Sequence, residues 1–187
     1  MSVFYYNLQI LELINIPLRI ITNIIQNTGG NLWRIKIRIT DFDCSKEYNS
    51  AIYKYCPYIK YSSIILDNQN LDELKDVLIR CKHLEALDVI VDYNKHYYGD
   101  HDKFLDLLIK LAPDGLYKFH MNWEIFNIES LQLFFNNWKG RKTLQLYDHM
   151  SNWLFIIELY EIEGIVGYKD CEGFWDDDNY TKITWKN

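Results

Sequence analysis

Long apolar runs, proline and glycine are all scarce in this sequence, and each absence narrows the choice of fold. The 187 residues include three prolines and eight glycines, and no Ser/Gly-rich linker interrupts them, which favours one domain over residues 1–187. No stretch of about 18 apolar residues is free of charge, so we expect no membrane-spanning segment. The N-terminal apolar stretch contains Glu12 and Arg19 and lacks a basic leader region, so a signal peptide is not expected.

The short motifs that accompany common active sites are also missing. The sequence has no CxxC pair, no HExxH, no GxSxG and no glycine-rich phosphate loop. Its cysteines are Cys44, Cys56, Cys81 and Cys171, and the nearest two are 12 residues apart. Structural zinc sites usually take two ligands from one tight turn. We therefore expect no catalytic residue, no metal and no cofactor.

One alternative of a different class stays open. His96, His101 and the acidic residues at 176–178 carry donor atoms that a small metal-dependent enzyme would need. Clustered acids near a C-terminus, as in residues 175–179, are more often a solvated surface, and loop histidines are usually solvated as well. The sequence therefore favours binding over catalysis.

Charge and cysteine content indicate the class of partner and the compartment. The net charge of −6 argues against general affinity for nucleic acid, which needs a basic surface. Cysteines without a signal peptide indicate reduced thiols, so we expect a cytoplasmic or nuclear protein. Apolar residues make up 49% of the chain and aromatic residues 16%, which is enough for one well-packed core.

A short apolar phrase recurs along the chain, with one aliphatic residue followed by others three and five positions later. It reads LQILEL, LWRIKI, IKYSSI, LEALDV, LYKFHM and, in a degenerate form, RKTLQL. The phrases begin at 8, 32, 59, 84, 116 and about 141, which is the period and core pattern of leucine-rich repeats. The sequence thus predicts an α/β solenoid of about five to six irregular repeats, with parallel strands on the concave face and helices on the convex face.

The segments between the phrases carry helix signals. Asn70 and Asn127 are suited to cap helices at their N-termini, and Gly140 and Gly164 are suited to end them. We place the repeats at about 8–147, followed at 148–187 by a C-terminal helix and an atypical polar cap with one or two short strands.

Small residues recur three positions before the leading aliphatic residue of several phrases. These residues are Gly29, Cys56, Cys81 and Pro113. Cys56 and Cys81 are 25 residues apart, which is one repeat period. We therefore interpret both as equivalent structural positions at the start of successive strands, where close stacking favours small side chains.

Side chains that alternate with the core positions should point outward along the sheet, because strand residues alternate between its two faces. A ladder of basic, aromatic and polar side chains there suits an acidic peptide or protein surface. The predicted partner-binding residues are Arg34, Lys36, Arg38, Tyr61, Ser63, Asp88, Lys118, His120 and Asn122.

In order and spacing, these phrases resemble a known family. NTGGNLWRIKI, IYKYCPYIKYSSIIL, LDELKDVLIRCKHLEALDVIV, LLIKLAPDGLYKF, LQLFFNNWKGRK and YEIEGIV are similar to segments of the fungal F-box-like leucine-rich-repeat proteins expanded in mycorrhizal fungi. The resemblance covers roughly residues 8–167. It implies a non-enzymatic protein-binding module, similar to the substrate-recognition part of F-box ubiquitin-ligase receptors.

The resemblance has a gap where the F-box would be expected. Residues 16–25, IPLRIITNII, resemble the opening of an F-box, but strand patterns on both sides leave no room for its remaining helices. We therefore expect a Skp-type adaptor as a partner only if an F-box lies upstream. The alternative is a stand-alone decoy or regulatory protein that binds partners without recruiting a ligase.

Overall fold

Strands and helices alternate through the part of the chain that the structure describes. The computed structural model describes residues 4–66, 71–91, 102–148, 154–170 and 174–175. The strands are β1 Ile10–Ile14, β2 Arg34–Arg38, β3 Tyr61–Leu66, β4 Ala86–Val91, β5 Lys118–His120, β6 Leu144–Asp148 and β7 Val166–Asp170. The helices are α1 Leu18–Gln26, α2 Ser45–Tyr55, α3 Leu71–Arg80, α4 Asp102–Leu111, α5 Ile128–Trp138 and α6 Leu154–Ile162, with a short 3-10 helix, η2, at Trp123–Ile125.

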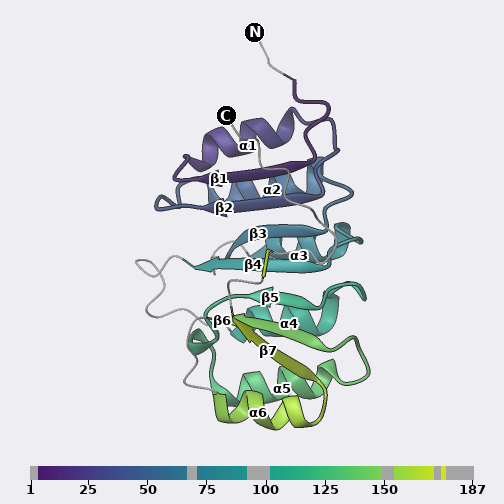
Figure 1. Cartoon of the computed structure of the whole chain (residues 1–187). Helices are drawn as coiled ribbons and strands as arrows, with labels where there is room; N and C mark the ends of the chain where they lie inside the picture. The colour runs from purple at the N-terminus through teal and green to yellow at the C-terminus, as the bar shows by residue number, and fades with distance from the viewer. Residues whose placement is uncertain (1–3, 67–70, 92–101, 149–153, 171–173, 176–187) are drawn as a thin grey trace, which may run out of the picture.

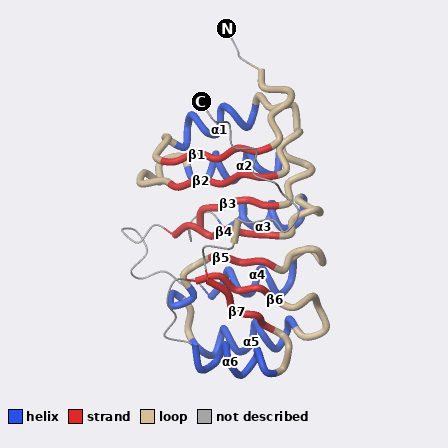
Figure 2. Tube along the Cα trace, viewed as in Figure 1, coloured by secondary structure: helices blue, strands red, loops and turns tan. Residues whose placement is uncertain are grey.

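All of these strands join one parallel sheet whose spatial order follows the sequence order, β1 to β7. Each helix therefore connects two strands that lie side by side. Figure 1 and Figure 2 show the helices together on one side of the sheet. The other side is called the open face below. An α/β fold with parallel strands alternating with helices is thus confirmed.

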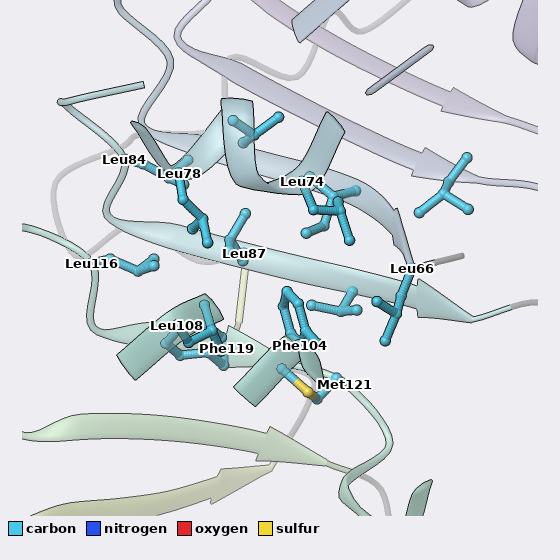
Figure 3. Packing of buried hydrophobic residues seen from close by; sticks show 14 of the residues in the cluster. Leu66, Leu74, Leu78, Leu84, Leu87, Phe104, Leu108, Leu116, Phe119 and Met121 are labelled. Atoms are coloured by element: carbon cyan, nitrogen blue, oxygen red, sulfur yellow. The ribbon is translucent and has the colours of Figure 1, made fainter. Parts of the chain in front are cut away.

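The main core fills the space between the sheet and the helices. Ile35, Leu87, Phe119 and Leu146 are fully buried and follow one inward column of the sheet, which Ser62 interrupts on β3. Leucines and phenylalanines from α3, α4 and the adjoining strands interdigitate in the layer between them (Figure 3). Each such side chain contributes about 1.5–3 kcal/mol by leaving water. The apolar phrases of the sequence are therefore the core-facing strand positions.

Helix ends agree with the sequence signals wherever the structure describes them. Asn127 Oδ1 accepts a hydrogen bond from the Ser130 amide at 2.7 Å at the start of α5, as expected of an N-cap. Gly140 and Gly164 have φ values of 86° and 72°, which suit the left-handed turn that ends a helix. The predicted cap Asn70 lies outside the described residues.

The same turn precedes three successive strands. The carbonyls of Cys56, Cys81 and Pro113 accept hydrogen bonds from amides three residues later, at 3.2, 3.1 and 3.0 Å. Both cysteines are free and buried. Burial raises the pKa of each thiol from 9.0 to about 12. The interpretation of these cysteines as equivalent structural positions is confirmed.

The C-terminal part of the chain extends the sheet beyond the predicted repeats. The sequence predicts the repeats to end near residue 147, followed by a C-terminal helix and a polar cap with one or two short strands. β7 nevertheless pairs in parallel with β6, and Val166 aligns with Leu144. Val166 and Ile165 join the main core, so this part of the segment follows the architecture of the preceding units.

The sheet is weakest between β2 and β3, where side chains replace part of the backbone ladder. Register pairing stops after Ile35 and Ser62. Beyond that point Asn49 of α2 bonds to both backbone groups of Ile65, donating to its carbonyl at 2.8 Å and accepting from its amide at 3.1 Å. The Ile37 amide donates to Ser63 Oγ at 3.1 Å. Polar side chains therefore satisfy the buried groups that a continuous ladder would have paired.

The variant Asn49→Ala tests whether the Asn49 side chain replaces backbone hydrogen bonds that are missing between β2 and β3. It leaves the buried amide and carbonyl of Ile65 without partners, so we expect the free energy of unfolding to fall by about 2–4 kcal/mol. Urea denaturation measures the change. Asn137→Ala removes an exposed helix amide whose hydrogen bond to the Leu133 carbonyl is local, and should cost about 0.5 kcal/mol or less. Equal losses in the two variants would contradict a special role for Asn49.

Thiol labelling tests the burial of the two turn cysteines. Cys44 is exposed and should react with a maleimide in the native protein. Cys56 and Cys81 should stay unlabelled even near pH 10, because only the thiolate attacks and both pKa values are raised to about 12. Mass spectrometry of tryptic peptides measures this, with the protein unfolded in guanidinium as the control. Native labelling of Cys56 at the rate of Cys44 would refute it.

Candidate functional site

The structure brings most of the predicted partner-binding residues onto the open face. Arg34 of β2 aligns with Tyr61 of β3, and Tyr61 aligns through Ala86 with Lys118 of β5. A parallel column runs from Glu12 to Lys36 and, two strands further on, from Asp88 to His120. In-register parallel strands point aligned residues to the same face. The alternation in the sequence predicted this placement.

The centre of this face is buried, however, where a solvated surface was expected. Tyr61, Ser63 and Asp88 have exposed fractions of 4%, 0% and 1%, and Arg34 and Lys118 are nearly as buried. Lys36 and His120 are half-buried, and Arg38 is exposed. Residues accessible to a partner therefore lie around a buried centre rather than along the whole ladder.

Asn122 lies outside the ladder. β5 ends at His120, and Asn122 instead caps the short helix η2, its Oδ1 accepting a hydrogen bond from the Glu124 amide at 2.9 Å. Asparagine after a strand favours such a local turn over continued extension. Its side chain is thus used within the fold.

The buried carboxylate of Asp88 organises the centre of the open face. Ser63 Oγ donates to Asp88 Oδ2 at 2.8 Å, and Arg38 Nη1 donates to the same oxygen at 2.9 Å. His120 Nδ1 lies 2.6 Å from Oδ1. These three partners come from β3, β2 and β5, while Asp88 belongs to β4. One carboxylate therefore ties together four neighbouring strands.

This arrangement differs from that of a nucleophilic triad. Ser63 Oγ donates its proton to the carboxylate and accepts the amide of Ile37, so it is held by structural partners rather than by an imidazole base. Tyr48 adds a further anchor by donating to the Ser63 carbonyl at 2.7 Å. Burial, and secondly the charge of Asp88, raises the pKa of Tyr48 well above its usual value. The geometry suits a rigid polar scaffold.

An aromatic pair from the C-terminal segment covers part of the open face. Phe174 and Trp175 are 1% and 7% exposed and pack with Tyr61, Ala86 and Tyr147. These five residues are called the open-face cluster below. Figure 1 draws the pair in yellow, in front of the sheet beside the β4 label. Trp33 packs against the cluster, with its ring 6.0 Å from that of Tyr61.

Cations of the face surround this aromatic cover. Arg34 Cζ and Lys36 Nζ lie 5.2 and 5.4 Å from the Trp175 ring centre, within cation–π distance. Lys118 Nζ lies 5.6 Å from the Tyr61 ring centre. Burial lowers the pKa of Lys36, an effect partly opposed by Glu12. The site therefore combines aromatic surface with desolvated positive charge.

Sequence reasoning missed Trp33, Phe174 and Trp175 as parts of this site. The sequence pattern of residues 175–179 favours a solvated acidic surface, but Trp175 is buried on the sheet. The available signal was an aromatic pair within an otherwise polar segment, since two such rings cover a large apolar area that favours burial.

The metal-dependent alternative receives no support from the described part of the chain. His96, His101 and residues 176–178 lie outside the described residues. Within the described ranges, no group of three His, Cys, Asp or Glu side chains is placed to hold a metal ion. In the same ranges no helix has the length and apolar character needed to cross a bilayer.

Comparisons of the chain with models of protein families, with curated proteins and with solved structures gave no match.

Asp88→Asn tests the scaffold role of the carboxylate. The amide keeps the shape but presents donor hydrogens to groups that donate, so we expect a loss of about 3 kcal/mol in the free energy of unfolding. Urea denaturation at neutral pH measures it. Asp106→Asn changes an exposed acid on α4 and should cost about 0.5 kcal/mol or less. A loss at Asp88 no larger than at Asp106 would contradict the scaffold role.

Proposed function

We propose that this protein is a non-enzymatic binding module of the leucine-rich-repeat type, which takes a partner protein on the open face of its sheet. The observation that carries the proposal is the mixture of cations and aromatic rings on that face. The hydrogen bonds of the Asp88 carboxylate to Arg38, Ser63 and His120 hold the strands that present these side chains. Such a surface resembles a binding site more than a catalytic one, because the buried hydroxyl that contacts Asp88, that of Ser63, is engaged by structural partners.

The repeat type is supported by three independent features. The strand order follows the sequence, so each unit contacts the next as in a solenoid. The turn at Cys56, Cys81 and Pro113 recurs with the same hydrogen bond. The apolar phrases recur at leucine-rich-repeat spacing and supply the core. In that architecture the open face is the concave surface, where partners commonly bind.

Charge supports an acidic partner. Among the described residues, the strand positions of the open face carry five cationic side chains and two acidic ones, a net charge of +3, although the whole chain carries −6. Opposed local and overall charge favours an oriented approach of an acidic surface. The contributing residues are Glu12, Arg34, Lys36, Arg38, Asp88, Lys118 and Lys169.

The resemblance to F-box-like leucine-rich-repeat proteins supports a role similar to that of a substrate receptor. Within this chain, the segment that resembles an F-box opening contributes α1, which connects β1 to β2 and packs against α2. That helix is part of the layer that packs on the sheet and does not form a separate adaptor-binding domain. Partner binding is therefore proposed for this chain itself, and recruitment of a Skp-type adaptor depends on a separate F-box.

Charge reversal at Lys36 tests the proposal. Lys36→Glu places a like charge opposite an acidic partner and should reduce capture of bound proteins from extracts of the expressing cells about tenfold or more. Quantitative mass spectrometry of the captured proteins measures this. Lys75→Glu, the same change on exposed α3, is the control and should leave capture unchanged. Unaltered capture by a folded Lys36→Glu protein would contradict binding through the open face.

A further inference from the structure

The pair Phe174–Trp175 occupies the open face through its side chains. Phe174 lies 5.2 Å from the Tyr147 ring and 5.5 Å from the His120 ring, measured between ring centres. Trp175 stacks edge-on against Phe174 at 5.0 Å. Among the described residues, no backbone hydrogen bond joins the pair to a strand. The pair is therefore held as side chains of a bound peptide would be, in a site made by the sheet.

The surroundings of the pair favour acidic neighbours. Arg34 and Lys36 lie against the Trp175 ring. Two buried donor atoms, Arg34 Nε and Trp175 Nε1, have no hydrogen-bond acceptor among the described groups. The Nη2 atom of the same guanidinium already pairs with Glu12 Oε1 at 2.9 Å. Buried donors of this kind are normally paired, so the site lacks an acceptor that a carboxylate could provide. In the sequence, Glu172 precedes the pair and three aspartates at 176–178 follow it.

We propose that the open face recognises, in a partner protein, a segment with two adjacent aromatic residues next to acidic residues, and that Phe174–Trp175 is an internal competitor for this site. The inference deepens the proposed function and rests on it. The aromatic rings of the partner segment fill the open-face cluster, and its carboxylates meet Lys36 and the unpaired Nε of Arg34.

Tethering sets how strongly the internal pair competes. Three residues separate the end of β7 at Asp170 from Phe174, and short tethers give effective concentrations of about millimolar. A partner segment then binds with an apparent affinity reduced by the fraction of molecules whose face is uncovered. Removing the pair, or lengthening its tether, should raise the affinity of an added segment without altering the site itself.

The test uses a fluorescein-labelled peptide of residues 171–180, with serine in place of Cys171, and fluorescence anisotropy. We expect the peptide to bind the Phe174→Ala/Trp175→Ala protein at least about tenfold more tightly than the native chain. A peptide with both aromatic residues changed to alanine should not bind. A peptide with asparagine at 176–178 should bind several-fold more weakly and with less dependence on salt.

A second variant keeps every native side chain, in case the double substitution prevents folding. Insertion of a 40-residue Gly/Ser linker after Asp170 lowers the effective concentration of the pair. Peptide affinity should then rise several-fold above that of the native chain. Adding Lys36→Glu to either variant should lower its affinity for the peptide, whereas adding Lys75→Glu should leave that affinity unchanged.

Two results would overturn the inference. One is equal peptide affinity, or no binding, for the native chain and for whichever variant is folded. The other is equal binding of the peptide without its aromatic residues. The peptide experiment could fail while Lys36→Glu still reduces capture of cellular proteins. That result would reject the aromatic–acidic motif and leave the proposed function standing. If the peptide does not bind as expected and Lys36→Glu also leaves capture unchanged, binding through the open face is rejected.

Discussion

A single buried carboxylate, Asp88, fixes the strands on which the open face depends. Between β2 and β3 the backbone ladder ends after two register pairs, and without other bonds the sheet would divide there. Asp88 binds Arg38 from one side of this gap and Ser63 from the other, and it reaches His120 beyond β4. A buried charge is costly on its own, so its position is defined by the partners that satisfy it. Arg38 and His120 are in turn held at the border of the exposed surface.

The open-face cluster depends on this fixed frame. Tyr61 and Ala86 belong to the two strands that carry Ser63 and Asp88, and they form the floor against which Trp175 and Phe174 pack. The cations on β2 then lie at the border of an aromatic surface in a partly desolvated setting, where a charge interacts more strongly than in water. The Asp88 network and the open-face cluster therefore share the same strands, two residues apart on β3 and on β4.

Local sequence signals predicted the fold well because they depend on neighbouring residues only. The apolar phrases, the Asn127 cap and the cysteine turns all follow from spacing within one unit of the chain. The alternation of strand residues also placed Arg34, Lys36, Tyr61 and Asp88 on one face. The burial of Tyr61 and Arg34 could not be predicted in the same way, because both pack with Phe174 or Trp175, which reach the sheet from a distant part of the sequence. The hydrogen bonds between Asn49 and Ile65 could not be predicted, because nothing in the sequence marks where backbone pairing between β2 and β3 ends.

The contact between Trp175 and Arg34 also changes how the molecule is expected to unfold. Units that touch only their neighbours behave as a linear array, and such an array can fray from either end. Residues 34 and 175 belong to the second strand and to the segment after the last one, so their contact spans most of the array. It links the second strand to the C-terminal segment, so opening β2 and releasing that segment both break the same contact. The array therefore gains cooperativity that its neighbour-to-neighbour contacts alone would not provide.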